Sequence, residues 1–203
     1  MTKQGGYIMS VAGITEALQY LTFRLEDEVF ALNISQVREV LDFTEVTKVP
    51  RTPDFMRGVI NLRGGVVPVV DLRLKFGMPK TEKTVDTCII IAEVTVDDET
   101  TVLGALADSV QEVMDLEPGQ IEPPPKIGTR LNTEFLKGMG KRDEEFILIL
   151  DIDKVFSFDE LAVVQSAGGG AALSERRELK DKVPLTTQVS EPSDMPDEAA
   201  LAS

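Results

Sequence analysis

One arginine stands between two apolar runs, where its side chain is expected to point into solvent. The stretch GVINLRGGVVPVVDLR, residues 58–73, joins these runs through Arg63, Gly64 and Gly65, a pattern typical of a hairpin. The guanidinium is a planar fork of donors that suits a carboxylate or a backbone carbonyl. An isolated arginine usually only keeps a hairpin tip in water. The rigid proline of TPDFMRG and the close approach that Gly58 and Gly64 allow favour recognition of a protein.

Residues that could hold a metal or a phosphate form weaker patterns. Asp151 and Asp153 in LDIDK would share one face of a strand, but a hard cation needs several more oxygen ligands, so polar caps are the favoured interpretation. The acidic run 97–99 lacks the spacing of a calcium loop. GMGKR, residues 138–142, has Phe135 where a phosphate loop needs its first glycine. The sequence therefore predicts neither a metal site nor a cofactor.

Nucleophilic catalysis is also disfavoured. The chain contains no histidine, which removes Ser/His/Asp and Cys/His activation and the HExxH zinc site. The single cysteine, Cys88, lies in the apolar run TCIII and is expected to be a buried small hydrophobe, since no neighbour would lower its pKa. These absences weigh against an enzyme.

Charge and composition exclude further classes. The 203 residues carry a net charge of -14 and a sequence pI near 4.5, so a nucleic-acid backbone would mostly be repelled. No apolar window reaches the roughly 18 residues that a membrane span needs, and the N-terminus has no signal-peptide pattern. We therefore expect a cytoplasmic protein without direct membrane insertion.

The elements that must position these residues are mostly strands. From Tyr20 to about Val164 the sequence shows short runs rich in Val, Ile, Leu and Phe, bounded by Gly, Pro or polar clusters, which predicts an all-β barrel or sandwich. One further hairpin is expected around the four-residue loop 97–100. Short helices are expected at 35–42, 71–76 and 157–165, where a serine or an aspartate could cap the first turn.

Composition divides the chain into three segments. Residues 1–19 are expected to be a flexible leader, 20–165 the folded domain, and 166–203 a disordered acidic tail, since the last segment is polar, proline-containing and without period. The tail holds four Lys/Arg and seven Asp/Glu, a net of -3. IEPPPKIG, residues 121–128, is expected to be a rigid connection rather than a polyproline ligand. No internal repeat with a clear period is visible.

The string TPDFMRGVINLRGGVVPVVDLRLKFG resembles the signature of the CheW family, the chemotaxis coupling proteins. The resemblance continues through VREVLDFTEVTKVP before it, and through TVLGALADSVQEVMDLEPGQIEPPP and EFLKGMGKRDEEFILILDIDKVF after it. It covers about residues 20–165. The unusual positions are Cys88, where valine would be unremarkable, and the long tail, which leaves open whether an extra partner exists.

The resemblance implies an all-β, CheW-like fold of two intertwined five-stranded barrels, each similar to a Src-homology-3 domain, with a few short helices. It also implies a non-catalytic adaptor that couples the cytoplasmic tips of chemoreceptors to the regulatory domain of the CheA histidine kinase. A ring assembly with the kinase is a further implication. Such an adaptor would be associated with membrane receptor arrays only through its partners.

Site residues follow from the same resemblance. The receptor-facing groove is expected to include Val37, Glu39, Gly58, Arg63, Ile89 and Val113. The apolar members would receive the hydrophobic stripe of the receptor helices, and the charged ones would fix register. Contact with the kinase is expected at Gly64, Gly104 and Gly138, although turn geometry explains these glycines equally well.

Two alternatives belong to other classes. A small-molecule or oligosaccharide-binding barrel would need aromatic side chains facing a cleft, and the chain has no Trp and only two Tyr. An enzyme that uses carboxylates alone would need two of them at a fixed separation, which the sequence does not reveal.

Overall fold

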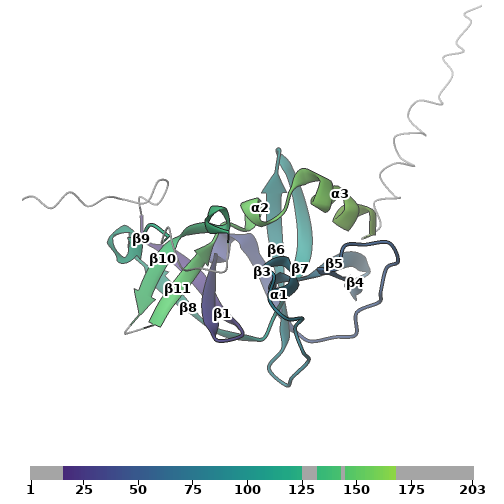
Figure 1. The fold of residues 1–203 in the computed structure, drawn as a ribbon, viewed down its shortest axis with the longest axis horizontal. Coiled ribbons are helices and arrows are strands. Elements are labelled where there is room, and N and C mark those ends of the chain that lie inside the picture. The colour runs from purple at the N-terminus through teal and green to yellow at the C-terminus, as the bar shows by residue number, and fades with distance from the viewer. Residues whose placement is uncertain (1–15, 125–131, 143–144, 168–203) are drawn as a thin grey trace, which may run out of the picture. The chain divides into compact units, whose positions relative to one another are not determined.

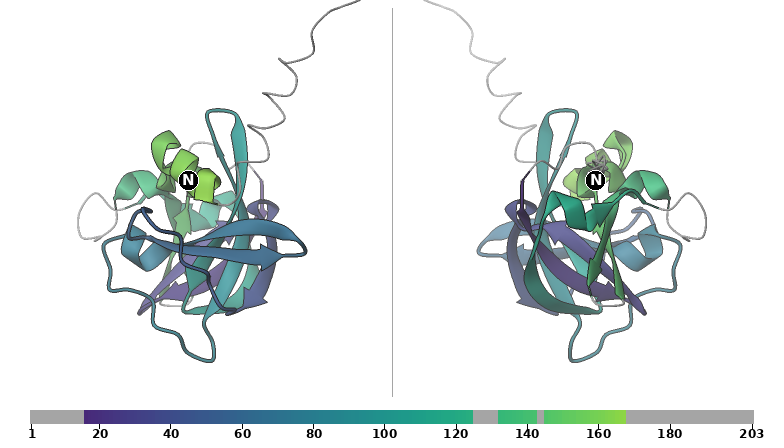
Figure 2. Two further views of the ribbon diagram at one scale, coloured as in Figure 1. Left: turned by 90° about the vertical axis from the view of Figure 1, so that its right-hand side faces the viewer. Right: turned by 90° about the vertical axis from the view of Figure 1, so that its left-hand side faces the viewer.

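The computed structural model describes residues 16–124, 132–142 and 145–167 (Figure 1). Most of the expected leader and tail, and part of the proline-rich connection, lie outside these ranges. The described residues form two curled sheets and a few short helices (Figures 1 and 2). Among them, no helix has both the length and the apolar character to cross a bilayer.

The chain passes from the first sheet to the second and back again. The first sheet has the order β8 (Ser109–Leu116), β1 (Leu18–Leu25), β2 (Glu28–Asn33), β11 (Glu145–Leu150), β10 (Leu136–Arg142) and β9 (Ile121–Glu122). The second has the order β3 (Val37–Asp42), β6 (Cys88–Val96), β7 (Glu99–Ala107), β5 (Gly65–Asp71) and β4 (Met56–Leu62). All five strands of the second sheet lie between β2 and β8 in sequence, so the two units are intertwined as expected.

Two hairpins, one in each sheet, have the same construction. β4 pairs with β5 and β10 with β11, and each pair has a bulge two residues after its first residue, at Gly58 and Gly138. Each second strand also pairs in parallel with a strand of its own sheet, β5 with β7 and β11 with β2. A short helix follows each hairpin: α1 (Leu72–Lys75) and α2 (Ile152–Val155). The structure therefore contains an internal duplication that the sequence pattern does not show.

The apolar runs are explained by burial on both faces of the central strands. In β6, Ile90 and Val94 belong to the core shared by the two sheets, whereas Ile89 and Ile91 belong to a cluster inside the second sheet. A strand covered on both faces reads as a continuous apolar run rather than an alternating one. The shared core includes side chains from both sheets and from α3 (Phe158–Ala167), so the two sheets have one hydrophobic core in common.

A largely buried arginine joins the two sheets through polar contacts. Arg73 of α1 pairs with Glu26, in the β1–β2 turn, at 2.7 Å and with Asp108, between β7 and β8, at 3.2 Å. Its Nε also donates to the carbonyl of Pro79 at 2.8 Å. Asp108 accepts from the amide of Glu26 at 2.6 Å. Arg73 therefore fixes the end of one sheet against the turns of the other.

The predicted helices have mixed outcomes. The helices at 71–76 and 157–165 are confirmed as α1 and α3, and Asp71 caps α1 by accepting from the amides of Arg73 and Leu74. The prediction of a helix at 35–42 is wrong. Residues 34–36 form a single 3₁₀ turn, and strand β3 begins directly after it. Exposure alternates along β3 with period two, which is the strand pattern. The loop expected at 97–100 is shorter, since β7 begins at Glu99.

Candidate functional site

Arg63 lies at the tip of the β4–β5 hairpin, as the sequence predicts. Only Arg63 and Gly64 separate the two strands, and both have positive φ, 52° and 85°. Two consecutive positive φ values are typical of the type I′ turn that matches strand twist. Asn61 accepts a hydrogen bond from the Gly64 amide at 3.0 Å. The Arg63 side chain is 78% exposed, so the tip presents it to solvent.

A single ion pair connects this tip to the opposite edge of the sheet. Arg63 Nη2 lies 2.8 Å from Oε2 of Glu39 in β3. The order of the second sheet places β3 and β4 at its two ends, so this contact requires the sheet to curl until its edges approach. The exposed guanidinium fork keeps further donors for a partner, while Glu39 sets its direction.

Gly58 makes the closure of this sheet possible. Thr47, in the β3–β4 connection, exchanges two backbone hydrogen bonds with Val59 at 2.9 and 2.8 Å. Gly58 has φ 138°, and a Cβ there would lie 2.1 Å from the carbonyl oxygen of Thr47. A side chain would push the two segments apart. Gly58 is buried, so its role is to maintain the curl of the sheet and not to contact a partner directly.

The expected apolar contacts are only partly at the surface. Val113 in β8 is 47% exposed, and Val37 at the start of β3 is half-buried. Ile89 is fully buried in β6. Because β6 is covered on both faces, Ile89 lies behind the side chains that reach solvent in this structure.

Sequence reasoning missed a set of partly accessible apolar side chains in the second sheet. Five partly buried apolar side chains pack against the cluster that contains Ile89. Three follow Glu39 in sequence, one precedes Arg63 and one belongs to β7; they are Leu41, Phe43, Val46, Leu62 and Val102. We call Glu39, Arg63 and these five residues the Glu39–Arg63 face. The alternating pattern of β3 could have revealed Leu41, because residues 39 and 41 lie on the same face of a strand. The remaining members come from separate segments that only the curl of the sheet gathers.

The three glycines assigned to kinase contact have different environments. Gly64 is exposed, with open space where a side chain would go. Gly104 is buried in β7, and a Cβ there would lie 2.6 Å from Cγ2 of Ile89. Gly138 is buried at the bulge of β10. Internal packing accounts for glycine at position 104, and the bulge of β10 accounts for it at position 138.

The carboxylates considered for metal binding have partners within the fold. Asp151 is 6% exposed and pairs with Lys154 at 2.9 Å and Lys137 at 3.5 Å. Asp153 accepts from Gln36 Nε2 at 3.0 Å and from the Thr95 amide at 2.7 Å. No group of three or more potential ligands gathers within the described ranges. These side chains therefore fix α2 against neighbouring segments.

Cys88 is buried, as expected, and its thiol is poorly suited to chemistry. Burial is the largest influence on its pKa, and the negative charges of Asp108 and Asp42 act in the same direction. A hydrogen bond with the backbone of Val110 opposes them. The net effect raises the pKa of Cys88 to about 11, so the reactive thiolate is scarce at neutral pH.

Comparisons with known proteins agree with one another. The family model described as the CheW-like domain matches residues 19–160. The chemotaxis protein CheW of Klebsiella aerogenes is 35% identical over 159 residues, which cover 78% of this chain and 93% of that protein. The probable chemotaxis protein CheW of Rhizobium etli is 34% identical over 142 residues, 70% of this chain and 89% of that protein.

A solved structure supports the same relationship. The scaffolding protein TtCheW from Thermoanaerobacter tengcongensis has a TM-score of 0.63 and 36% sequence identity, and the match covers 70% of this chain and 94% of that one. The predicted all-β fold of two intertwined units is thereby confirmed.

Proposed function

Because this chain belongs to the CheW family of non-catalytic chemotaxis scaffold proteins, we propose that it joins two specific partners in a receptor array. One is the cytoplasmic tip of a methyl-accepting chemoreceptor, and the other is the regulatory domain of a CheA histidine kinase. The protein works in the cytoplasm and reaches the membrane through these partners. It holds the kinase at a fixed position, so that a change in the receptor alters kinase geometry.

The observation that carries the receptor assignment is the Glu39–Arg63 pair. It orients an exposed guanidinium on the same sheet that carries partly accessible apolar side chains. A helix with an apolar stripe and a carboxylate or carbonyl at its border suits such a surface. Val37 at the start of β3 and Val113 on β8 extend the apolar contact, whereas Gly58 and Ile89 maintain the face from within.

Contact with the kinase is proposed at the exposed turn residue Gly64. Gly64 adjoins Arg63, so the two proposed interfaces approach each other at this hairpin. Gly64→Asn tests the assignment, because asparagine tolerates positive φ better than other side chains. We expect weaker kinase binding with receptor binding retained. A ring in which this protein alternates with the kinase would follow from two separate kinase contacts.

The deciding experiment is gel filtration of the purified chain with a CheA regulatory domain and, separately, with a receptor cytoplasmic fragment from the same genome. We expect co-elution with both. Arg63→Ala should abolish co-elution with the receptor fragment only. Arg38→Ala is the matched control, since Arg38 lies on β3 beside Glu39 and forms an exposed ion pair with Glu93. Equal loss at both partners on Arg63→Ala would refute the receptor assignment, and binding to neither partner would refute the adaptor role.

A further inference from the structure

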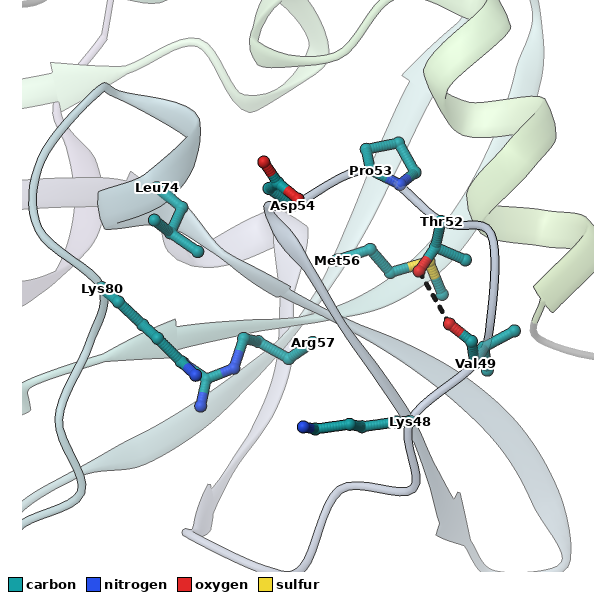
Figure 3. A pocket seen from close by; sticks show the side chains of 9 residues that line it. All are labelled: Lys48, Val49, Thr52, Pro53, Asp54, Met56, Arg57, Leu74 and Lys80. Atoms are coloured by element: carbon teal, nitrogen blue, oxygen red, sulfur yellow. Dashed lines mark hydrogen bonds between the residues drawn. The ribbon is translucent and has the colours of Figure 1, made fainter.

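A second polar site lies in the second sheet, in a pocket of about 410 Å³. Figure 3 shows it between the β3–β4 connection, the start of β4, α1 and the segment after α1. Its lining residues are Lys48, Val49, Thr52, Pro53, Asp54, Met56, Arg57, Leu74 and Lys80. Three of these carry a positive charge and only Asp54 a negative one, although the whole chain has a net charge of -14.

The two lysines of this pocket have no carboxylate of their own. Neither Lys48 nor Lys80 forms an ion pair with another residue in the part of the chain that the structure describes, and both are exposed. Figure 3 shows Lys80 and Arg57 extending into the opening from opposite sides, with Lys48 below them. Like charges gathered at one site repel one another. An anion bound among them would remove this repulsion.

Hydrogen bonds on the protein side of the pocket fix the position of the Arg57 guanidinium. Its Nη1 donates to Asp71 at 2.8 Å and to the carbonyl of Thr81 at 3.2 Å. Asp71 is fully buried and also accepts from the amide and hydroxyl of Thr81 at 3.1 and 2.8 Å. Both bonds of Arg57 use Nη1, so Nε and Nη2 have no hydrogen-bond partner among the described residues. A fork that is fixed and still has free donors is suited to bidentate binding of an oxyanion.

We propose that this pocket binds a phosphate group, either free or as the ester of a small organic molecule. Arg57 supplies the oriented fork, and Lys48 and Lys80 supply the remaining charge. Val49, Met56 and Leu74 offer apolar surface to the organic part of an ester. The volume falls in the range of about 300 to 1,000 Å³ that small-molecule sites occupy. Asp54 lowers the affinity for an anion. With Asp71 behind Arg57 also counted, the three basic side chains still exceed the two carboxylates by one positive charge.

The test is a titration of the purified, ¹⁵N-labelled full chain with inorganic phosphate and, separately, with phenyl phosphate. Amide chemical shifts are recorded at each ligand concentration. Sodium chloride keeps the ionic strength constant, so general screening cannot produce the signal. We expect saturable shifts around residues 48–57 and 80–81. Lys48→Gln combined with Lys80→Gln should weaken binding at least tenfold. Lys141→Gln removes an exposed lysine outside the pocket and should change nothing.

Each outcome decides the proposal. Tighter binding of phenyl phosphate than of phosphate supports an ester as the ligand, and equal binding supports a free oxyanion. Shifts that do not saturate, or affinity that survives loss of both lysines, would overturn the site. Because no partner protein is present, a negative result here leaves the adaptor role untouched, and failure of the adaptor test leaves this site standing.

Discussion

Arg63 and Glu39 lie 2.8 Å apart although they come from opposite ends of the strand order β3-β6-β7-β5-β4. Arg63 is 78% exposed and Glu39 is 24% exposed. The pair therefore combines two properties that a docking residue needs: one charged group that reaches a partner, and a second that limits its motion. Surface ion pairs add little to stability, about 0 to 1 kcal/mol, so the main effect of this pair should appear in binding.

A double-mutant cycle separates these two roles. Arg63→Ala should weaken receptor-fragment binding by about 1 to 3 kcal/mol, the scale of an interface hot spot, and change the free energy of unfolding by less than about 1 kcal/mol. Glu39→Ala should weaken binding less, because Arg63 remains but is no longer oriented. Titration calorimetry would measure both. If Glu39 acts through Arg63, the double variant binds no worse than Arg63→Ala; additive losses would contradict that role.

Substitution of two glycines with positive φ, Gly58 in β4 and Gly64 in the β4–β5 turn, should have unequal effects on stability. Gly58→Ala should cost more than about 2 kcal/mol in the free energy of unfolding, since it combines positive φ with a clash against the Thr47 carbonyl. Gly64→Ala should cost only about 1 to 2 kcal/mol, because its positive φ disfavours alanine but the surrounding space is open. Urea unfolding of the two variants measures the difference. Equal losses would show that the close approach of Thr47 does not matter.

A size exchange tests the packing of Gly104 against Ile89. Gly104→Ala should destabilise the fold, because its Cβ would lie 2.6 Å from Cγ2 of Ile89. Ile89→Ala should cost about 2 to 5 kcal/mol by leaving a cavity. Combined, the two changes should cost about 1 to 2 kcal/mol less than their sum, since the new methyl group enters the vacated space. Unimpaired kinase binding by the folded Gly104→Ala variant is the control; its loss would restore Gly104 to the interface.

The attachment of α3 should make stability depend on pH in acid. Lys75 is 12% exposed, donates to Glu160 of α3 and lies 4.9 Å from the Phe55 ring. Burial acts to raise the pKa of Glu160, but hydrogen bonds from Lys75 and Ser157, with the charge of Lys75, outweigh it and lower that pKa.

A lowered folded-state pKa means that ionised Glu160 stabilises the fold above the unfolded-state pKa of about 4.3. This contribution is lost as the pH falls through the folded-state value. Denaturant unfolding between pH 7 and 3 gives the free energy of unfolding at each pH. This free energy should fall less steeply with acid for Glu160→Gln than for the wild type. At neutral pH the variant should be less stable by less than about 1 kcal/mol. Asp159→Asn, its exposed neighbour on α3, is the control. A Glu160→Gln curve parallel to the wild-type curve would rule out this linkage.

Cys88 should resist alkylation in the folded protein. It is 6% exposed, and burial raises its pKa to about 11, so both access and thiolate fraction are low at pH 8. Iodoacetamide should label it at least about a hundredfold more slowly in buffer than in urea. Mass spectrometry at timed intervals measures both rates. Comparable rates would mean that the start of β6, where Cys88 lies, unfolds locally and often in the native state.

The sequence alone determined the class of the fold and the residue at the centre of the candidate face. Apolar runs of strand length, punctuated by Gly and Pro, are a local property, and so is a glycine-rich turn that presents Arg63. The cap at Asp71 was visible for the same reason. The segment at 35–42 shows the limit, since a serine before an apolar stretch also suits a helix, and only pairing of β3 with β6 selected the strand.

The tertiary structure decided which side chains are accessible and which distant groups meet. The family resemblance suggests partner contacts for Ile89 and Gly104, but β6 and β7 are covered on both faces, so both residues are interior. The approach of Glu39 to Arg63 and of Lys48 to Arg57 depends on how far the second sheet curls. Curl is the sum of small twists between many paired strands, and no short stretch of sequence encodes that sum.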